Sequence, residues 1–255
     1  MQLAIDTSTD YCGLALGREG KTMAEVNWKA GQNHTTQLIP ALRSLLQLVR
    51  AEPGELTSIA VALGPGSYNG LRAGLSTAKG FAFSLGIPVV GVGTLEVEAY
   101  PHRPGGMPVR PVHNAGREEI ATALYQRRDD RWQEMEAPHL TTIALLCRRI
   151  HEPTVLCGEL TADLVSELKS IPGDLAIIHP PTPTPRRAGW LLELAWQRLR
   201  MGDADNPTTL QPIYLREPAI TIPRPRPTSK GAQRVHQGEP SPREGLQQVL
   251  RLRQG

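Results

Sequence analysis

Short apolar runs separated by turn residues occupy the first 30 residues of the chain. They cover residues 3–7, 12–17 and 22–28, and Gly20 and Lys21 lie between the last two. Apolar runs of this length at hairpin spacing are typical of antiparallel strands. The pattern predicts a three-stranded meander at the start of the chain.

Helix and strand signals then alternate up to residue 92. Leucine and valine recur at helical spacing over residues 35–50, which predicts an amphipathic helix with Asn33 as its N-cap. Residues 58–64 are typical of a buried strand, a second helix is expected from the GPGSYNG segment to about Leu85, and residues 87–92 supply another strand. This order predicts a mixed α/β fold and not a doubly wound parallel sheet. The apolar positions of the first helix are Leu38, Leu42, Leu45, Leu46 and Val49.

A second half follows a Pro/Gly-rich joint at residues 101–108 and has a similar plan with weaker signals. Two halves of one plan predict an internally duplicated fold, although the sequence itself shows no repeat. We expect lobes at residues 1–100 and 101–222 and a separate tail at 223–255. The expected elements are strands at 107–114, 118–128, 131–137, 154–158 and 175–179, and helices at 142–149, 161–169 and 186–201, the last with Leu191, Leu192, Ala195 and Leu199 toward the core.

Composition excludes several classes of protein. The chain has 255 residues, 40% hydrophobic and 21% charged, and its apolar runs are far shorter than the roughly 20 residues of a membrane span. The opening residues lack the basic and apolar regions of a secretory signal, and the three cysteines have no CxxC spacing. We therefore expect a cytoplasmic protein with no membrane segment, disulfide framework or zinc site.

The basic excess is confined to the tail. Residues 223–255 contain seven Lys or Arg and two Glu, whereas the rest of the chain contains 21 basic and 23 acidic residues. A Pro/Gly/Ser/Gln-rich segment with little apolar surface is expected to be disordered. The alternative is an arm that binds phosphates weakly, without base stacking because it has no aromatic residue.

The segment AIDTSTD places Asp6, Thr7, Ser8 and Thr9 at the end of a strand. Hydroxyls and amides in such a turn can bind phosphate oxygens, and the carboxylate can bind a metal-bound water. The alternative is an Asx or ST turn whose side chains bond their own backbone. The spacing does not decide between the two.

The GPGSYNG segment, residues 64–70, precedes a helix and could favour an anion there, but it lacks the lysine of a Walker motif. The glycines and alanines that follow recur every fourth residue and predict a smooth ridge for another helix, from this chain or from another subunit. This ridge comprises Gly70, Gly74, Ala78 and Ala82. No second histidine stands four residues after His34, where Leu38 is found, and no GxSxG or HExxH motif is present.

The segments AIDTSTDYCGLAL, NHTTQLIPAL, ALGPGSYNGLRAGLSTAKGFAF and QPIYLREP closely resemble the TsaB (YeaZ) family, over about residues 1–218. The resemblance implies the two-lobed actin/hexokinase/Hsp70-like ATPase fold with a degenerate nucleotide site. It also implies a non-catalytic scaffold that supports threonylcarbamoylation of N6 of adenosine 37 in tRNAs reading codons that begin with A. The implied partners are the catalytic paralogue TsaD and the ATPase TsaE, with tRNA bound indirectly or weakly by the tail, and a homodimer is an alternative for the free chain.

The resemblance implies that the first-lobe helices bind TsaD, that the chain alone needs no cofactor or metal, and that ATP or ADP and metal bind the partner subunits. Departures from the family pattern occur at Asn114 and Gly116, where Asp and Arg are usual, and at Tyr68 and Asn69. The alternative function is an ATP-dependent phosphotransferase or ATPase that uses Asp6 and Thr9. The interface candidates are Leu38, Leu42, Leu45, Gly70, Arg72, Gly74 and Ala78.

Overall fold

The structure, a computed structural model, describes residues 1–31, 33–129, 131–178 and 186–216. The described residues all belong to one compact unit, Met1–Pro218. The predictions for the basic tail fall outside the described residues. No helix in the described ranges has the length and apolar character needed to cross a bilayer.

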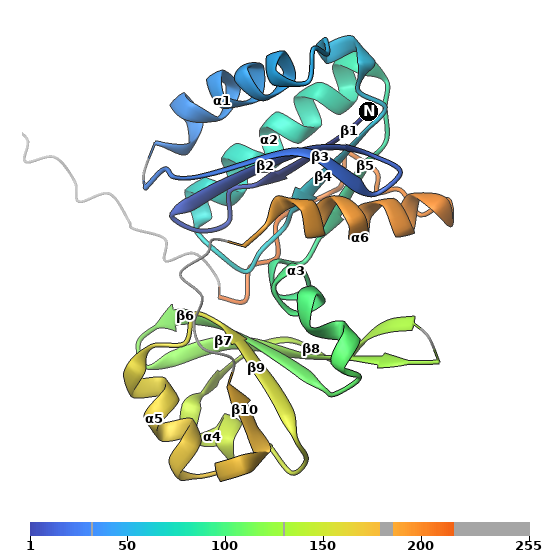
Figure 1. Cartoon of the computed structure of the whole chain (residues 1–255). Coiled ribbons are helices and arrows are strands. Elements are labelled where there is room, and N and C mark those ends of the chain that lie inside the picture. Colours follow the sequence, from blue (N-terminus) through green and yellow to red (C-terminus); the bar gives the residue numbers. More distant parts are fainter. Residues whose placement is uncertain (32, 130, 179–185, 217–255) are drawn as a thin grey trace, which may run out of the picture. The chain divides into compact units, whose positions relative to one another are not determined.

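The first sheet has five strands in the order β3-β2-β1-β4-β5 (Figure 1). Strands β1 (Gln2–Asp6), β2 (Tyr11–Arg18) and β3 (Lys21–Lys29) form the predicted antiparallel meander. Strands β4 (Ser58–Ala62) and β5 (Val89–Val92) continue the sheet in parallel from β1. This arrangement confirms the strands expected from the apolar runs.

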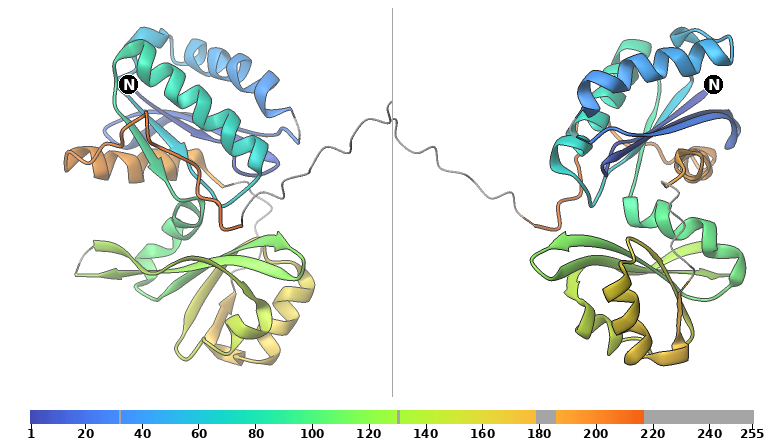
Figure 2. Two further views of the ribbon diagram at one scale, coloured as in Figure 1. Left: turned by 180° about the vertical axis from the view of Figure 1, so that it is seen from behind. Right: turned by 60° about the vertical axis from the view of Figure 1, so that its left-hand side comes forward.

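Helices cover both faces of this sheet, with α1 (His34–Leu48) and α2 (Tyr68–Leu85) on one face and α6 (Ala188–Arg200) on the other (Figure 2). Alternation along the strands gives the two faces different side chains. Leucine and isoleucine of β1 and β2 face α1 and α2, whereas alanines face α6 and leave room for its leucines. The small residues are Ala4, Ala15, Ala60 and Ala62.

The second sheet repeats the strand order of the first, as β8-β7-β6-β9-β10. It contains β6 (Val109–Gly116), β7 (Glu119–Arg128), β8 (Arg131–Thr142), β9 (Thr154–Gly158) and β10 (Ala176–Ile178). Helices α4 (Ile143–Cys147) and α5 (Ala162–Ser170) pack on it, and α3 (Thr94–Ala99) leads into β6. Two sheets with one strand order confirm the predicted mixed α/β fold and its internal duplication.

Two local features differ from the sequence expectation. Helix α6 follows the second sheet in the chain but packs against β1, β2 and β3 of the first. Asn33 is the N-cap residue of α1, as predicted, but its side chain makes no capping hydrogen bond. The lobe boundaries at residues 100 and 222 stay predictions.

Candidate functional site at the end of strand β1

The carboxylate of Asp6, the last residue of β1, accepts hydrogen bonds from two residues. Arg186 Nε lies 2.7 Å from Oδ2, and Arg186 Nη2 lies 3.3 Å from Oδ1. The backbone N–H and the hydroxyl of Ser8 also donate to Oδ1, at 3.0 and 2.6 Å. Only 2% of Asp6 is exposed, so the guanidinium neutralises a carboxylate that has almost no access to water.

The same guanidinium reaches a second carboxylate and a histidine. Arg186 Nη1 lies 3.1 Å from Glu98 Oε2 on α3 and 3.3 Å from His113 Nε2 on β6. The side chain of Arg186 is 7% exposed. One buried cation therefore links the ends of β1 and α3 with β6.

The ionisation of this network follows from its geometry. Burial alone would raise the pKa of Asp6, but the charge of Arg186 and the hydrogen bonds it receives hold that pKa below its usual value. The pKa of Glu98 is lowered to about 2, because hydrogen bonds and charges from His113 and Arg186 outweigh desolvation. Burial would lower the pKa of Arg186, but the two carboxylates raise it. Both acids and the arginine are thus charged at neutral pH.

The turn after β1 makes hydrogen bonds with the first residues of helices α1 and α2 and with Ser67, the N-cap residue of α2. Thr7 Oγ1 donates to Gly70 O at 2.7 Å, and the backbone N–H of Ser67 donates to Ser8 O at 2.7 Å. His34 Nε2 lies 2.8 Å from Thr9 O. These contacts occupy the Thr7 hydroxyl and the carbonyl oxygens of Ser8 and Thr9.

The structure thus shows an internally bonded turn. Asp6 bonds Ser8, and Thr9 Oγ1 accepts the backbone N–H of Tyr11 at 3.2 Å. A cofactor role for residues 6–9 stays a prediction, and binding a ligand at Asp6 would require displacing Arg186. In the described part of the chain, no group of three or more His, Cys, Asp or Glu side chains lies close enough to bind a metal.

The glycine ridge of α2 packs on β1 and the turn after it. A Cβ on Gly70 would collide with Thr7 O, and a Cβ on Gly74 would collide with Thr7 Oγ1. The close neighbour that the ridge requires is therefore a strand end of the same chain. A partner cannot reach these glycines while α2 is in place.

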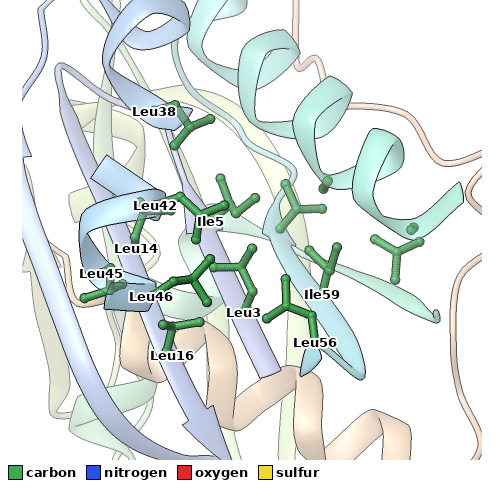
Figure 3. Close-up of a cluster of buried hydrophobic side chains, with 14 of the residues drawn as sticks. Leu3, Ile5, Leu14, Leu16, Leu38, Leu42, Leu45, Leu46, Leu56 and Ile59 are labelled. Atoms are coloured by element: carbon green, nitrogen blue, oxygen red, sulfur yellow. The ribbon is translucent and has the colours of Figure 1, made fainter. Parts of the chain in front are cut away.

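The apolar interface candidates also lie inside the molecule. Leu38, Leu42 and Leu45 are 1–3% exposed, and Ala78 is fully buried in the same cluster, between α1, α2 and the sheet (Figure 3). The apolar stripe of an amphipathic helix marks the face toward its own sheet. Of the seven candidates, only Arg72 is exposed, so the partner interface, which stays a prediction, needs other contact residues.

An exposed aromatic cluster surrounds Arg72 at the start of α2. The Arg72 guanidinium carbon lies 4.2 Å from the Tyr68 ring centroid, and the rings of Tyr68 and Tyr214 are 5.2 Å apart. Arg72 Nε also donates to Tyr214 Oη at 3.4 Å. The GPGSYNG and PIYLR segments, far apart in the sequence, thus meet in one surface cluster of Tyr68, Arg72 and Tyr214.

The second-lobe turn has Asn114 at the position where the TsaB family usually has Asp. Asn114 Oδ1 accepts the backbone N–H of Gly116 at 2.8 Å, which closes a local turn. Arg216 Nη1 donates to Ala115 O at 3.2 Å, and Arg216 also pairs with Glu119. This turn is held by backbone and side-chain bonds within the chain.

Sequence reasoning missed three members of the Asp6 network, namely Arg186, Glu98 and His113. Arg186 lies 180 positions from Asp6, and no motif surrounds it. Tyr214, in contrast, lay inside a segment that carried the resemblance. No local signal predicts its contact with Tyr68, which lies in another of those segments.

More than half of the chain matches a known protein family. A family model described as "TsaD: tRNA N6-adenosine threonylcarbamoyltransferase" matches residues 28–171, more than half of the chain. The chain therefore belongs to this family. Its similar curated relatives include TsaB proteins, which confirms the resemblance to the TsaB (YeaZ) family.

The TsaB protein of Bacillus subtilis is 42% identical over 124 residues, covering 49% of this chain and 54% of the relative. The TsaB protein of Escherichia coli is 32% identical over 127 residues, with the same two coverages. These matches span about half the length of each relative. The structure of YeaZ from Pseudomonas aeruginosa, 24% identical, superposes with a TM-score of 0.70 over 84% of this chain and 99% of that one, which shows a shared fold.

Proposed function

We propose that this chain is an accessory subunit in tRNA threonylcarbamoyladenosine synthesis, which binds a TsaD-type catalytic paralogue and performs no chemistry alone. The observation that carries the proposal is the buried pair of Asp6 and Arg186. A carboxylate that binds metal-bound water in a working nucleotide site here binds a guanidinium. The names of the curated relatives support the pathway.

The binding surface in this proposal is the outward side of α1 and α2, which lie together on one face of the first sheet (Figure 2). Phe83 is 61% exposed, Leu48 73% and Ile39 49%. Arginine and tyrosine are frequent binding hot spots, and the Tyr68, Arg72 and Tyr214 cluster lies at the start of α2. Exposed α2 positions between the cluster and Phe83 are small, namely Ser76 and Gly80, and would let a partner helix approach closely.

The remaining components are assigned to the partners. The TsaD-type and TsaE-type subunits bind ATP or ADP and metal in this proposal, and tRNA reaches the complex mainly through them. A second copy of this chain would compete for the same α1 and α2 surface when the partner is absent.

Size-exclusion chromatography with light scattering tests the pairing. The chain is mixed with its own TsaD-type paralogue, as wild type, as Ser76→Arg on α2, and as Ser166→Arg on α5. Both serines are exposed helix residues, so both variants are expected to fold. We expect a heterodimer with wild type and Ser166→Arg, and its loss with Ser76→Arg. Equal complex formation by both variants would exclude the α2 surface, and absence of any wild-type complex would overturn the accessory role.

Calorimetry on the isolated chain tests the alternative ATPase function. We expect no saturable heat with millimolar Mg-ATP, because Arg186 occupies both oxygens of Asp6. Saturable binding together with phosphate release would favour the ATPase.

A further inference from the structure

We infer that Arg186 is a positioning residue for the partner-binding surface, because it fixes the turn after β1 and that turn fixes the start of α2. The inference rests on the proposed function for its binding readout. Its structural part concerns this chain alone and can be tested without a partner.

The first link joins Arg186 to the turn. Its guanidinium contacts Asp6 through Nε and Nη2, and Nη2 also contacts Ser8 Oγ. Asp6 Oδ1 accepts both the backbone N–H and the hydroxyl of Ser8. A planar guanidinium therefore closes the loop formed by Asp6 and Ser8, and the low exposure of all three side chains makes other donors unavailable.

The second link joins the turn to α2. Ser67 is the N-cap of α2, and its backbone N–H donates to Ser8 O at 2.7 Å. On the other side, Thr7 Oγ1 donates to Gly70 O at 2.7 Å within the first turn of α2. The two hydrogen bonds hold both ends of this helical turn to consecutive residues of the β1 turn.

The third link is the surface itself. Tyr68 and Arg72 extend from this part of α2 and meet Tyr214, which is held by the hydrogen bond from Ile213 N to Leu63 O at 2.8 Å. Tyr68 is 37% and Tyr214 38% exposed. Loss of Arg186 would leave Asp6 as a buried carboxylate without a counter-ion and would remove the Arg186 hydrogen bond to Ser8 Oγ. Both losses would loosen the turn that positions Tyr68 and Arg72.

Arg186→Met, Ser8→Ala and Leu164→Ala test the inference. Ser8→Ala removes only the hydrogen bonds of the Ser8 hydroxyl with Asp6 and Arg186. It replaces Arg186→Met in the test if Arg186→Met does not fold. Leu164→Ala is the matched control. Leu164 is buried in the core of the second sheet, so its truncation should lower stability at a site away from the turn after β1. The readouts are hydrogen–deuterium exchange over residues 67–72 in the free chain, and affinity for the TsaD-type paralogue.

We expect faster exchange over residues 67–72 in Arg186→Met, or in Ser8→Ala if it is the variant used, and wild-type exchange there in Leu164→Ala. Affinity should fall about tenfold for Arg186→Met and remain within about twofold of wild type for Leu164→Ala. Unchanged exchange over residues 67–72 would overturn the inference. Faster exchange with unchanged affinity would also overturn it, whereas lack of binding by the wild type would contradict the proposed function instead.

Discussion

Replacement of Gly74 by alanine separates internal packing of the α2 ridge from a role at the surface. Alanine stabilises an exposed helix position by about 1 kcal/mol relative to glycine. At position 74, however, the new methyl group would occupy the space of Thr7 Oγ1, and Ile5 Cγ2 lies only 3.6 Å from it. Thr7 is 1% exposed and bonded to Gly70 O, so its hydroxyl cannot move away freely.

The expected magnitude follows from two costs and one gain. Overpacking costs about 1–3 kcal/mol, and loss of the buried Thr7 hydrogen bond costs about 1–3 kcal/mol. After subtraction of the helix-propensity gain, Gly74→Ala should lower the free energy of unfolding by about 1–5 kcal/mol. Gly80→Ala is the control in the same helix, since no atom lies within 4 Å of a Cβ there, and it should raise that free energy by about 0.5–1 kcal/mol.

Urea denaturation followed by circular dichroism measures both effects. The Thr7 hydroxyl is absent in a Thr7→Ala background, so Gly74→Ala should lower the free energy of unfolding much less there than in the wild type. A double-mutant cycle measures this difference. Equal stabilisation by Gly74→Ala and Gly80→Ala would refute the packing argument. Because Gly74 packs internally, Gly74→Leu is expected to unfold the chain and does not report on an interface.

Three further predictions concern ionisable groups. Burial, and to a lesser extent the charge of Glu134, raises the pKa of Glu96 from 4.5 to about 7. This carboxyl therefore costs stability as pH rises from 4.5 through 7, and Glu96→Gln should raise the free energy of unfolding at pH 8 but not at pH 4. Glu98 has its pKa lowered from 4.5 to about 2, so its contribution is present above pH 4.5 and is lost as pH falls toward 2. Acid titration of unfolding should accordingly be less steep in Glu98→Gln over that window. All three cysteines are buried and have raised thiol pKa values, so Ellman's reagent at pH 8 should label none of them until urea unfolds the chain; rapid labelling of the native chain would contradict this burial.

Local patterns predicted most of the elements because each strand and helix carries its own signal. The apolar runs of β1, β2 and β4 and the leucine spacing of α1 depend on neighbouring residues alone. Periodicity also identified which side of α1 is apolar. It did not show that this side faces the chain's own sheet, which is why Leu38, Leu42 and Leu45 were candidates for a partner surface.

Local patterns do not predict which elements or side chains far apart in the sequence contact each other. The spacing of apolar residues in α6 predicts a buried face but does not specify which sheet covers it. The ion pair of Asp6 with Arg186 joins residues 180 positions apart, and a single arginine outside any motif gives no signal of its own. The turn at residues 6–9 leaves two alternatives open in the sequence. In the structure Asp6 and Thr9 make hydrogen bonds within the turn, and a cofactor role for these residues stays a prediction.

The central claim is that the chain acts through the surface of α2 and not through the turn after β1. The most direct test is a reconstituted tRNA modification reaction that contains the TsaD-type paralogue, the TsaE-type ATPase, tRNA, threonylcarbamoyl adenylate and this chain. Mass spectrometry of digested tRNA then measures threonylcarbamoyladenosine. We predict that formation requires this chain, persists with Ser166→Arg and is lost with Ser76→Arg. Full modification without the chain, or equal modification with both variants, would contradict the account.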